Sequence, residues 1–271
     1  MFAILNVEYK KTIGILNVFR RQKIKIERVD FDSFHYYVIN LKNARQGRIN
    51  WRKVAWAAGR EQSSLIIPND INLPENCPCK PFDDAPFMRH IFLSTVLNII
   101  KSANIRPASL TIGIVDAEAV APDAAILALN LAAAVKVVTA NTERYEHYSN
   151  QAMAATGAPL IISETYNTLN SCDIIIAPFG FTKNVTVDLQ KTIFDETGKS
   201  GFKILKEDII LPKDFASKIP QKISHSAIAA ALMERGRVPF AVNMAVKYFY
   251  INNIKLSAAD VKAHIKSRNN T

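Results

Sequence analysis

The chain has 271 residues, of which 49% are hydrophobic and 21% are charged, and its formal net charge is +10. This balance excludes a disordered or collagen-like chain, and the length suits one large domain or two ordinary ones. No apolar run reaches the roughly 18 to 20 residues of a membrane-spanning helix, and three cysteines are too few for a disulfide scaffold.

The positive charge is unevenly distributed along the chain. Residues 1–106 hold 17 Lys and Arg against 9 Asp and Glu, a net charge of +8, and residues 183–271 hold 15 against 8, a net charge of +7. Between them, residues 107–182 hold 2 against 7, a net charge of −5. The apolar residues of the N-terminus precede its lysines, the reverse of a secretory signal, so we expect a cytoplasmic location.

The first part of the chain has the pattern of a mixed α/β lobe, which we place at residues 1–106. Four short apolar or alternating runs predict strands, arranged as an antiparallel meander, at 2–7, 12–19, 23–31 and 34–41. A helix at 51–59 should begin after Asn50 and end at Gly59.

Two further elements and a proline-rich connection complete this lobe. A buried strand is expected at 63–68, and five prolines between residues 68 and 86 indicate a non-repetitive connection. Helical spacing at 86–105 predicts a long helix. We place the lobe boundary near residues 106–109.

Residues 107–271 show strands alternating with helices. Near-continuous apolar runs predict strands at 110–115, 135–140, 158–163 and 173–178, and helical spacing predicts helices at 122–134, 143–157 and 165–171. A strand at 202–206 follows, then helices at 224–236 and 257–267, the last with Ser257 as its N-cap. This alternation predicts a Rossmann-like, mostly parallel sheet with helices on both faces, whose ligands bind beyond the carboxyl ends of the strands.

The stretch VKVVTANTERYEHYSNQAMAATGAPLIISETYNTLNSCDIIIAP is similar to the cofactor domain of shikimate dehydrogenases and glutamyl-tRNA reductases. In those families an Asn-Arg-Thr-like turn ends the second strand, a helix and a Gly-Ala-like strand follow, and a short helix leads to an apolar strand that begins at Asp. The resemblance spans residues 110–178 and extends to the order of the lobes. It implies a Rossmann-type domain and an NAD(P) cofactor.

The loop after the first strand of this domain departs from the family pattern. Dinucleotide-binding domains have closely spaced glycines there, which let backbone N–H groups approach the pyrophosphate at a helix N-terminus. This chain has DAEAVAPD at 116–123, with three carboxylates and no glycine. One like-charge contact at about 4 Å costs on the order of 4 kcal/mol at an effective dielectric constant of about 20. Conventional NAD(P) binding is therefore disfavoured.

Our leading interpretation is a protein that binds a small ligand or a protein partner at the strand ends and does not catalyse hydride transfer. The candidate residues are Asp116, Glu118, Asn141, Thr142, Arg144, Ser163, Glu164, Thr165 and Phe179. Their carboxylates favour a cationic or hydroxylated ligand over a phosphate. The alternative is an NAD(P)-dependent oxidoreductase of shikimate-dehydrogenase-like architecture, which would use NADP through an arginine such as Arg144.

Nucleic-acid binding through the basic flanks is a third interpretation, ranked last. The stretch 41–53 places five cations beside Trp51, namely Lys42, Arg45, Arg48, Arg52 and Lys53. Such a cluster is suited to phosphate backbones, and a solvated loop and helix face is the competing interpretation. Cys77, Cys79 and His90 supply three ligands where a structural zinc site needs four, so we predict no metal site, and no membrane partner.

Overall fold

The structure is a computed structural model of the 271-residue chain. It describes residues 2–9, 21–31, 34–45, 48–181, 191–197, 201–204, 209–211, 213–234, 243–244, 249–251 and 254–269. The strand predicted at 12–19 lies outside these ranges. Among the described helices, none is long and apolar enough to cross a membrane.

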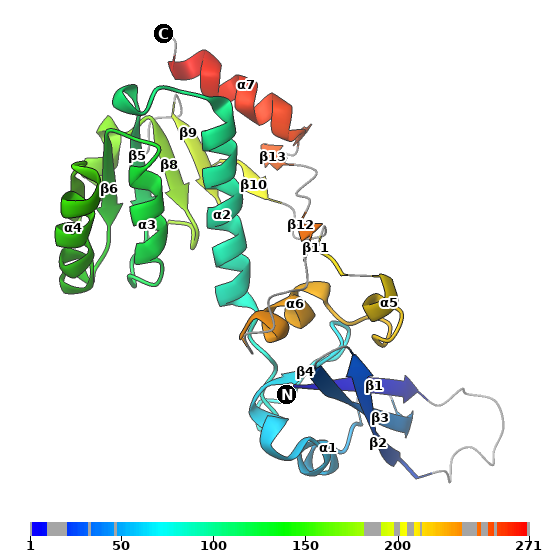
Figure 1. The fold of residues 1–271 in the computed structure, drawn as a ribbon. Helices are drawn as coiled ribbons and strands as arrows, with labels where there is room; N and C mark the ends of the chain where they lie inside the picture. Colours follow the sequence, from blue (N-terminus) through cyan, green and yellow to red (C-terminus); the bar gives the residue numbers. More distant parts are fainter. Residues whose placement is uncertain are drawn as a thin grey trace. The chain divides into compact units, whose positions relative to one another are not determined.

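The chain forms two compact units (Figure 1). Unit 1 consists of residues 1–87 and 209–245, and unit 2 of residues 88–208 and 246–271. The division differs from the two consecutive lobes expected from the sequence, because the chain returns to unit 1 after its first passage through unit 2. Such a return depends on contacts between segments that are far apart in the sequence, and local patterns do not report them.

A five-stranded sheet forms the centre of unit 2, in the order β7-β6-β5-β8-β9, and every neighbouring pair is parallel. Its strands are Thr111–Val115 (β5), Ala134–Val138 (β6), Leu160–Ser163 (β7), Ile174–Ala177 (β8) and Thr192–Asp195 (β9). This is the order of a Rossmann-like sheet, so the predicted fold class is confirmed. The sequence did not reveal β9, because polar Thr192 and Asp195 shorten its apolar run although both are buried.

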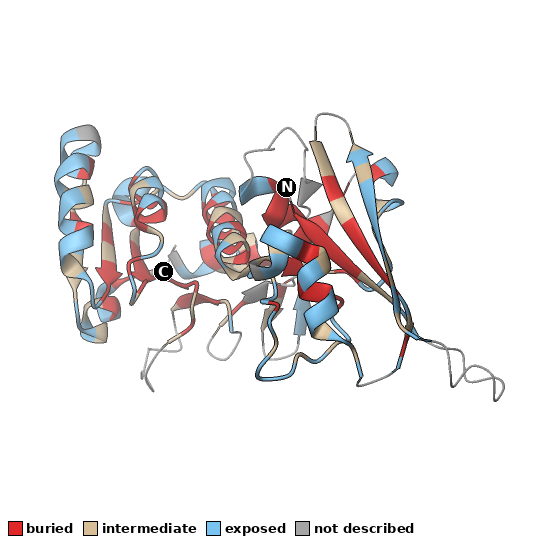
Figure 2. Cartoon of the chain, turned by 90° about the horizontal axis from the view of Figure 1, so that it is seen from below, coloured by how far each residue is buried: buried red, intermediate tan, exposed pale blue. Residues whose placement is uncertain are grey.

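Helices cover the two faces of this sheet unequally. Those on one face are Ala85–Ala103 (α2), Pro122–Leu129 (α3), Thr142–Thr156 (α4) and Ala258–Asn269 (α7), and they share one hydrophobic core with the strands. On the opposite face, Leu169 of the 3₁₀ helix Tyr166–Ser171 (η4) packs with Cys172 against Val115 and Ile175. A 3₁₀ helix, Pro107–Ser109 (η3), precedes β5. Most residues of β5, β6, β8 and β9 are buried (Figure 2).

The sheet of unit 1 has four strands in the order β2-β3-β1-β4. They are Ala3–Tyr9 (β1), Lys23–Phe31 (β2), Phe34–Ala44 (β3) and Leu65–Ile66 (β4). Strands β2 and β3 are antiparallel, but β1 runs parallel to both β3 and β4. The predicted antiparallel meander is therefore wrong for β1, because a parallel pair forms through a crossover and its partners are not neighbours in sequence.

Each face of this sheet is covered by different elements of unit 1. One face packs on Val54 and Ala55 of Trp51–Ala58 (α1), which the 3₁₀ helix Gly59–Ser63 (η2) follows. On the other, Phe215 of Lys213–Ala216 (α5) makes edge contacts with Phe31 and Tyr36, at ring-centroid distances of 4.9 and 5.7 Å. Burial raises the pKa of Tyr36 to about 12. The aromatic contacts explain why residues 209–245 belong to unit 1.

Short elements complete both units. In unit 1, the strands Ile209–Ile210 (β11) and Asn243–Met244 (β12) pair antiparallel, and the helix His225–Glu234 (α6) lies between them in sequence. In unit 2, Lys203–Ile204 (β10), Phe249–Ile251 (β13) and Ile254–Leu256 (β14) form a three-stranded antiparallel sheet.

The predicted helix caps at Asn50 and Ser257 are confirmed. Asn50 Oδ1 accepts a hydrogen bond from the backbone N–H of Lys53 at 3.2 Å. At the start of α7, Ser257 Oγ accepts from the N–H of Asp260, while Asp260 Oδ2 accepts from the N–H of Ser257 at 2.8 Å. These reciprocal bonds form a capping box, in which the carboxylate also interacts favourably with the helix dipole.

The capping box leads to a prediction about pH. Hydrogen bonds from the Ser257 side chain and backbone lower the pKa of Asp260. A carboxyl whose folded pKa is lowered stabilises the fold above its unfolded pKa, and that contribution disappears as the pH falls through the folded pKa. We expect an NMR titration of Asp260 to give a midpoint below the ordinary aspartate value, and Ser257→Ala to raise it. An ordinary midpoint in the unsubstituted chain would contradict the capping box.

Candidate functional site

The strand order of unit 2 has its topological switch point between β5 and β8. The chain leaves β5 toward β6 on one side and reaches β8 on the other, so the order of the strands reverses between them. In open α/β sheets, ligands bind at this reversal beyond the carboxyl ends of the strands. The segments at this position are residues 116–121 after β5 and 178–181 after β8.

Asp116 closes the loop after β5. Its side chain is fully buried, and its two carboxylate oxygens accept hydrogen bonds from the backbone N–H groups of Val120 and Ala121, both at 2.9 Å. The hydroxyl of Tyr145, on α4, donates a third hydrogen bond to Asp116 at 2.7 Å. Burial and the adjacent carboxylate raise the pKa of Tyr145, so the hydroxyl keeps its proton and remains a donor.

The carboxylate of Asp116 thus occupies the backbone donors that precede α3. Ala121 is the N-cap residue of α3, so these N–H groups lie at the helix N-terminus that follows the first strand, the part of a dinucleotide domain that binds pyrophosphate. Ala119 completes the turn with a φ of 52°, a left-handed conformation that glycine adopts more readily. The methyl group of Ala119 is buried in the hydrophobic core of unit 2, so the loop packs against that core.

The other predicted residues lie at the ends of the next two strands. Asn141 caps α4, because its Oδ1 accepts a hydrogen bond from the N–H of Arg144 at 3.3 Å. The side chain of Arg144 is exposed and that of Thr142 is half-buried. Buried Thr139, which the sequence did not single out, joins the ends of β5 and β6 by donating to the carbonyl oxygen of Ala117 at 3.3 Å.

Ser163 is the last residue of β7, and Glu164 and Thr165 follow it. The hydroxyl of Ser163 accepts hydrogen bonds from the Thr165 N–H at 3.1 Å and from the Thr168 hydroxyl at 2.8 Å, which fixes the start of η4. Glu164 and Thr165 are exposed, as is Glu118 in the loop after β5. These polar side chains are open to solvent and available to a ligand.

Phe179 lies after β8 and contacts a cation that the sequence analysis did not consider. The guanidinium of Arg89, on α2, lies 4.1 Å from the centre of the Phe179 ring, within the range of a cation–π interaction. Gly180 follows with a φ of 70°, and a side chain there would meet Thr197 Cγ2 at 2.5 Å. Arg89 thus places a positive charge beside the end of β8, whereas the exposed carboxylates of Glu118 and Glu164 follow β5 and β7.

A cavity of about 340 Å³ lies in unit 1, at the carboxyl ends of β1 and β4. Its lining comes from three segments: Asn6, Val7, Glu8 and Tyr9 at the end of β1, Pro68 and Asp70 after β4, and Pro220, Gln221 and Lys222 before α6. Two carboxylates, one ammonium group and two amides thus face the same space. The sequence analysis named none of these residues.

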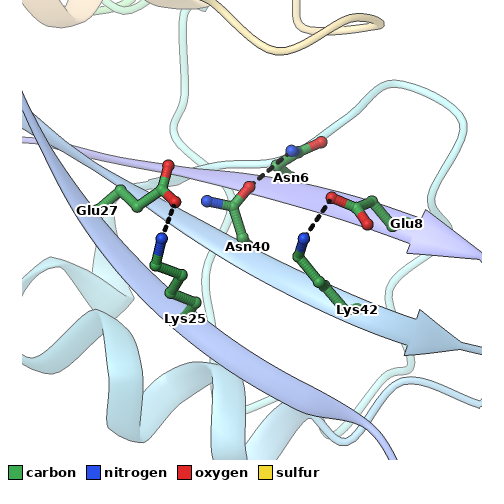
Figure 3. A network of polar contacts seen from close by, with 6 residues as sticks. All are labelled: Asn6, Glu8, Lys25, Glu27, Asn40 and Lys42. Carbon is green, nitrogen blue, oxygen red and sulfur yellow. Dashed lines mark hydrogen bonds and ion pairs between the residues drawn. The ribbon is translucent and has the colours of Figure 1, made fainter.

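A row of polar pairs crosses the sheet beside this cavity (Figure 3). Asn6 donates from Nδ2 to Asn40 Oδ1 at 2.7 Å, and Lys42 Nζ lies 3.6 Å from Glu8 Oε1. On β2, Lys25 pairs with Glu27 at 2.7 Å and lowers the pKa of that carboxyl. Asn6 and Glu8 belong to both the row and the cavity lining, because they alternate along β1 and face the same side.

The opposite wall of the cavity is held by an ion pair. Lys222 Nζ lies 2.7 Å from Asp70 Oδ2, and this hydrogen bond raises the pKa of Lys222. The backbone N–H of Asn69 donates to the carbonyl oxygen of Lys222 at 3.2 Å. Lys222 has a φ of 67°, an uncommon conformation for a residue with a side chain. These contacts join the returning segment to the loop after β4.

No protein-family model matches the chain, and no curated protein sequence is significantly similar to it. Several solved structures resemble it at low similarity. Δ1-pyrroline-2-carboxylate reductase of Thermococcus litoralis is 14% identical over 40% of this chain and 36% of its own, with a TM-score of 0.30. Quinate dehydrogenase of Corynebacterium glutamicum is 10% identical over 98% of this chain and 99% of its own, with a TM-score of 0.31.

Shikimate dehydrogenase of Aquifex aeolicus is among the similar structures, at 13% identity over 76% of this chain and 84% of its own, with a TM-score of 0.30. The chain spans only 36% of the length of the Thermococcus reductase. By name, one of these proteins is a reductase and two are dehydrogenases. The fold assignment of this chain rests on the strand order of its own sheet, and these similarities carry no conclusion about its activity.

The sequence contains one signal of the cavity in unit 1, whose lining residues the sequence analysis did not name. In the strand Ala-Ile-Leu-Asn-Val-Glu-Tyr, the polar residues Asn6 and Glu8 alternate with apolar ones, which marks one polar face at the end of β1. Asp70 and Lys222 had no such signal, because they meet only through the return of residues 209–245 to unit 1. In the described parts of the chain, no three His, Cys, Asp or Glu side chains gather as a metal site.

Proposed function

We propose that this protein binds a small organic cation and does not catalyse hydride transfer with a conventionally bound dinucleotide. The observation that argues against a conventionally bound dinucleotide is the position of Asp116, whose carboxylate accepts hydrogen bonds from the backbone N–H groups of Val120 and Ala121. A pyrophosphate needs donors of this kind at the first helix of a Rossmann-like unit.

The oxidoreductase alternative requires this loop to open. A dinucleotide phosphate at the N-terminus of α3 would have to displace Asp116, leaving the buried Tyr145 hydroxyl without its acceptor. An unsatisfied buried hydroxyl costs about 1–3 kcal/mol, and the displaced carboxylate would stay close to the phosphate and repel it. Cofactor binding in this manner would therefore be weak.

The cavity of unit 1 is the proposed binding site. Its lining includes the carboxylates of Glu8 and Asp70 and the ammonium group of Lys222, a net charge of −1. Asn6 and Gln221 add amide groups, which donate and accept hydrogen bonds. A small amine with additional hydrogen-bonding groups matches this lining, because its ammonium group can pair with Glu8, whose contact with Lys42 is long at 3.6 Å. The exposed Glu118 and Glu164 at the strand ends of unit 2 form the competing site, as proposed from the sequence.

Thermal-shift measurements and isothermal titration with ethanolamine, 1,4-diaminobutane, succinate and NADPH test this function. We expect stabilisation by an amine, and a loss of about tenfold or more in its affinity in Glu8→Gln, because a charge-assisted hydrogen bond contributes about 1.5–3 kcal/mol. Glu27→Gln is the matched control, since Glu27 is also paired with a lysine on this sheet but does not line the cavity.

Each contrary outcome has a distinct meaning. If Glu118→Gln abolishes amine binding and Glu8→Gln does not, the ligand binds at the strand ends of unit 2. Equal losses in Glu8→Gln and Glu27→Gln would indicate non-specific surface attraction. Tight NADPH binding, or binding of none of the amines, would overturn the proposal.

A further inference from the structure

A second surface of unit 1 has features that the ligand cavity does not explain. Trp56, on α1, is 82% exposed, although tryptophan is a large residue that is usually well buried. It has no ring contact with any other described side chain. A rigid aromatic ring that protrudes into solvent is available to stack on a flat partner.

The residues around Trp56 are cationic. Arg52 and Lys53 lie four and three positions before Trp56 on α1 and are exposed, so they share its face of the helix. Arg60, also exposed, follows in η2. In the described parts of the chain, no carboxylate forms an ion pair with any of these three cations. Between residues 41 and 60 the chain has six Lys and Arg and no Asp or Glu.

The basic surface extends beyond the N-terminus of α1. Gln22 links two segments, because its side chain donates to the carbonyl oxygen of Arg48 and accepts from the N–H of Asn50 at 3.1 Å. Arg48 is thereby held at the N-terminal end of α1. We define the basic face as Arg48, Arg52, Lys53, Trp56 and Arg60. It lies in unit 1, which holds 19 Lys and Arg against 11 Asp and Glu, a net charge of +8.

We propose that the basic face binds single-stranded nucleic acid, with a base stacked on Trp56 and the phosphates paired with the surrounding arginines and lysine. Proteins that bind single strands without sequence preference combine a positive surface with exposed aromatic rings in this way. Arginine adds bidentate hydrogen bonds to phosphate. The inference is independent of the ligand cavity, which is lined by other residues of the unit.

The structure favours nucleic acid over a membrane surface. A helix that lies in a membrane interface inserts a broad apolar face. Of the apolar residues of α1, Val54, Ala55 and Ala58 are buried in the core of unit 1, and Trp51 and Ala57 pack partly buried against it. Trp56 is therefore the one large apolar side chain of α1 that is exposed. An isolated ring between cations suits stacking better than insertion.

Fluorescence anisotropy with labelled oligouridylate and oligothymidylate at low ionic strength tests the proposal, with vesicles rich in phosphatidylserine as a third probe. We expect both oligonucleotides to bind and the affinity to fall with salt, since each phosphate contact contributes a slope of about −0.7 for single strands. Trp56→Ala should weaken binding at least about fivefold, and Trp56→Phe should weaken it less. Arg52→Ala should make the slope of log affinity against log salt concentration shallower by about 0.7, the contribution of one phosphate contact.

Two exposed residues of unit 2 provide matched controls. Leu127→Ala removes an exposed apolar side chain and Lys266→Ala an exposed cation, and both should leave binding unchanged. Because Trp56 is exposed, Trp56→Ala should fold normally, and circular dichroism would verify this. Binding that is insensitive to Trp56→Ala, binding to vesicles but not to oligonucleotides, or no binding at low salt would each overturn the proposal. A difference between the uridylate and thymidylate affinities would identify RNA or DNA as the preferred strand.

Discussion

Replacing Asp116 with alanine is expected to lower the free energy of unfolding by about 3 kcal/mol or more. The substitution removes the acceptor of three hydrogen bonds, from Val120, Ala121 and Tyr145. The Tyr145 side chain is fully buried, so water cannot readily replace the lost acceptor. Urea unfolding monitored by circular dichroism would measure the change.

Two variants separate the buried network from the general effect of losing a carboxylate. Tyr145→Phe removes one of the three donors and should cost about 1–2 kcal/mol. Glu118→Ala removes an exposed carboxylate from the same loop and should change the stability by less than about 0.5 kcal/mol. If Asp116→Ala were as mild as Glu118→Ala, the loop would not depend on the buried carboxylate.

The same substitution tests whether Asp116 occupies the position of a phosphate. In folded Asp116→Ala, the N–H groups of Val120 and Ala121 lose their acceptor and become available to an anion. Pyrophosphate should then shift the NMR signals of these two amides in the variant and leave them unchanged in the unsubstituted chain. Equal shifts in both proteins would show that the carboxylate does not block the site.

Replacing Gly113 with valine is expected to lower the free energy of unfolding by about 3 kcal/mol. Gly113 lies in the middle of β5, and a Cβ atom there would approach Leu169 Cδ2 to 2.7 Å and Cys172 Sγ to 3.0 Å. Both neighbours belong to the packed face that carries η4, so neither side chain has free space into which to move. Thermal or urea unfolding would measure the effect.

Gly157→Ala is the control for this prediction. Gly157 ends α4 with a φ of 69°, and an added Cβ would meet no atom within 4 Å. Only backbone strain then opposes the substitution, at about 1 kcal/mol. A loss at Gly113 no larger than that at Gly157 would contradict the close approach of η4 to β5.

Much of unit 2 follows from local patterns in the sequence. Strands β5 to β8 are apolar runs because both faces of a parallel sheet are covered, and the helices between them are marked by their spacing. Caps at Asn50 and Ser257 are readable because one polar side chain and the backbone two or three residues away suffice to form them. Strand β9 escaped notice because its buried polar ends resemble a loop.

The candidate sites follow from the sequence only in part. The residues after β5, β6 and β7 were expected to face a ligand together, and the structure instead uses several of them to secure loops and helix starts, Asp116 above all. The sequence identified the basic stretch around α1 but singled out Trp51, whereas the exposed ring belongs to Trp56. Helical spacing alone does not say which of two tryptophans faces the core.

Composition and residue spacing thus sufficed for the fold class, the strands β5 to β8 and the absence of a glycine-rich loop, because apolar runs, helical spacing and loop composition are each visible within a short stretch of sequence. The burial of Asp116, the parallel pairing of β1 and the pairing of Asp70 with Lys222 were decided only by the tertiary structure. Each of these features joins segments that are distant in sequence. The free energy that holds the segments together comes from packing and hydrogen bonds that form only as the chain folds. For the acidic loop after β5, the composition argues against a bound phosphate. The tertiary structure places the Asp116 carboxylate on the N–H groups of Val120 and Ala121, which a phosphate would need.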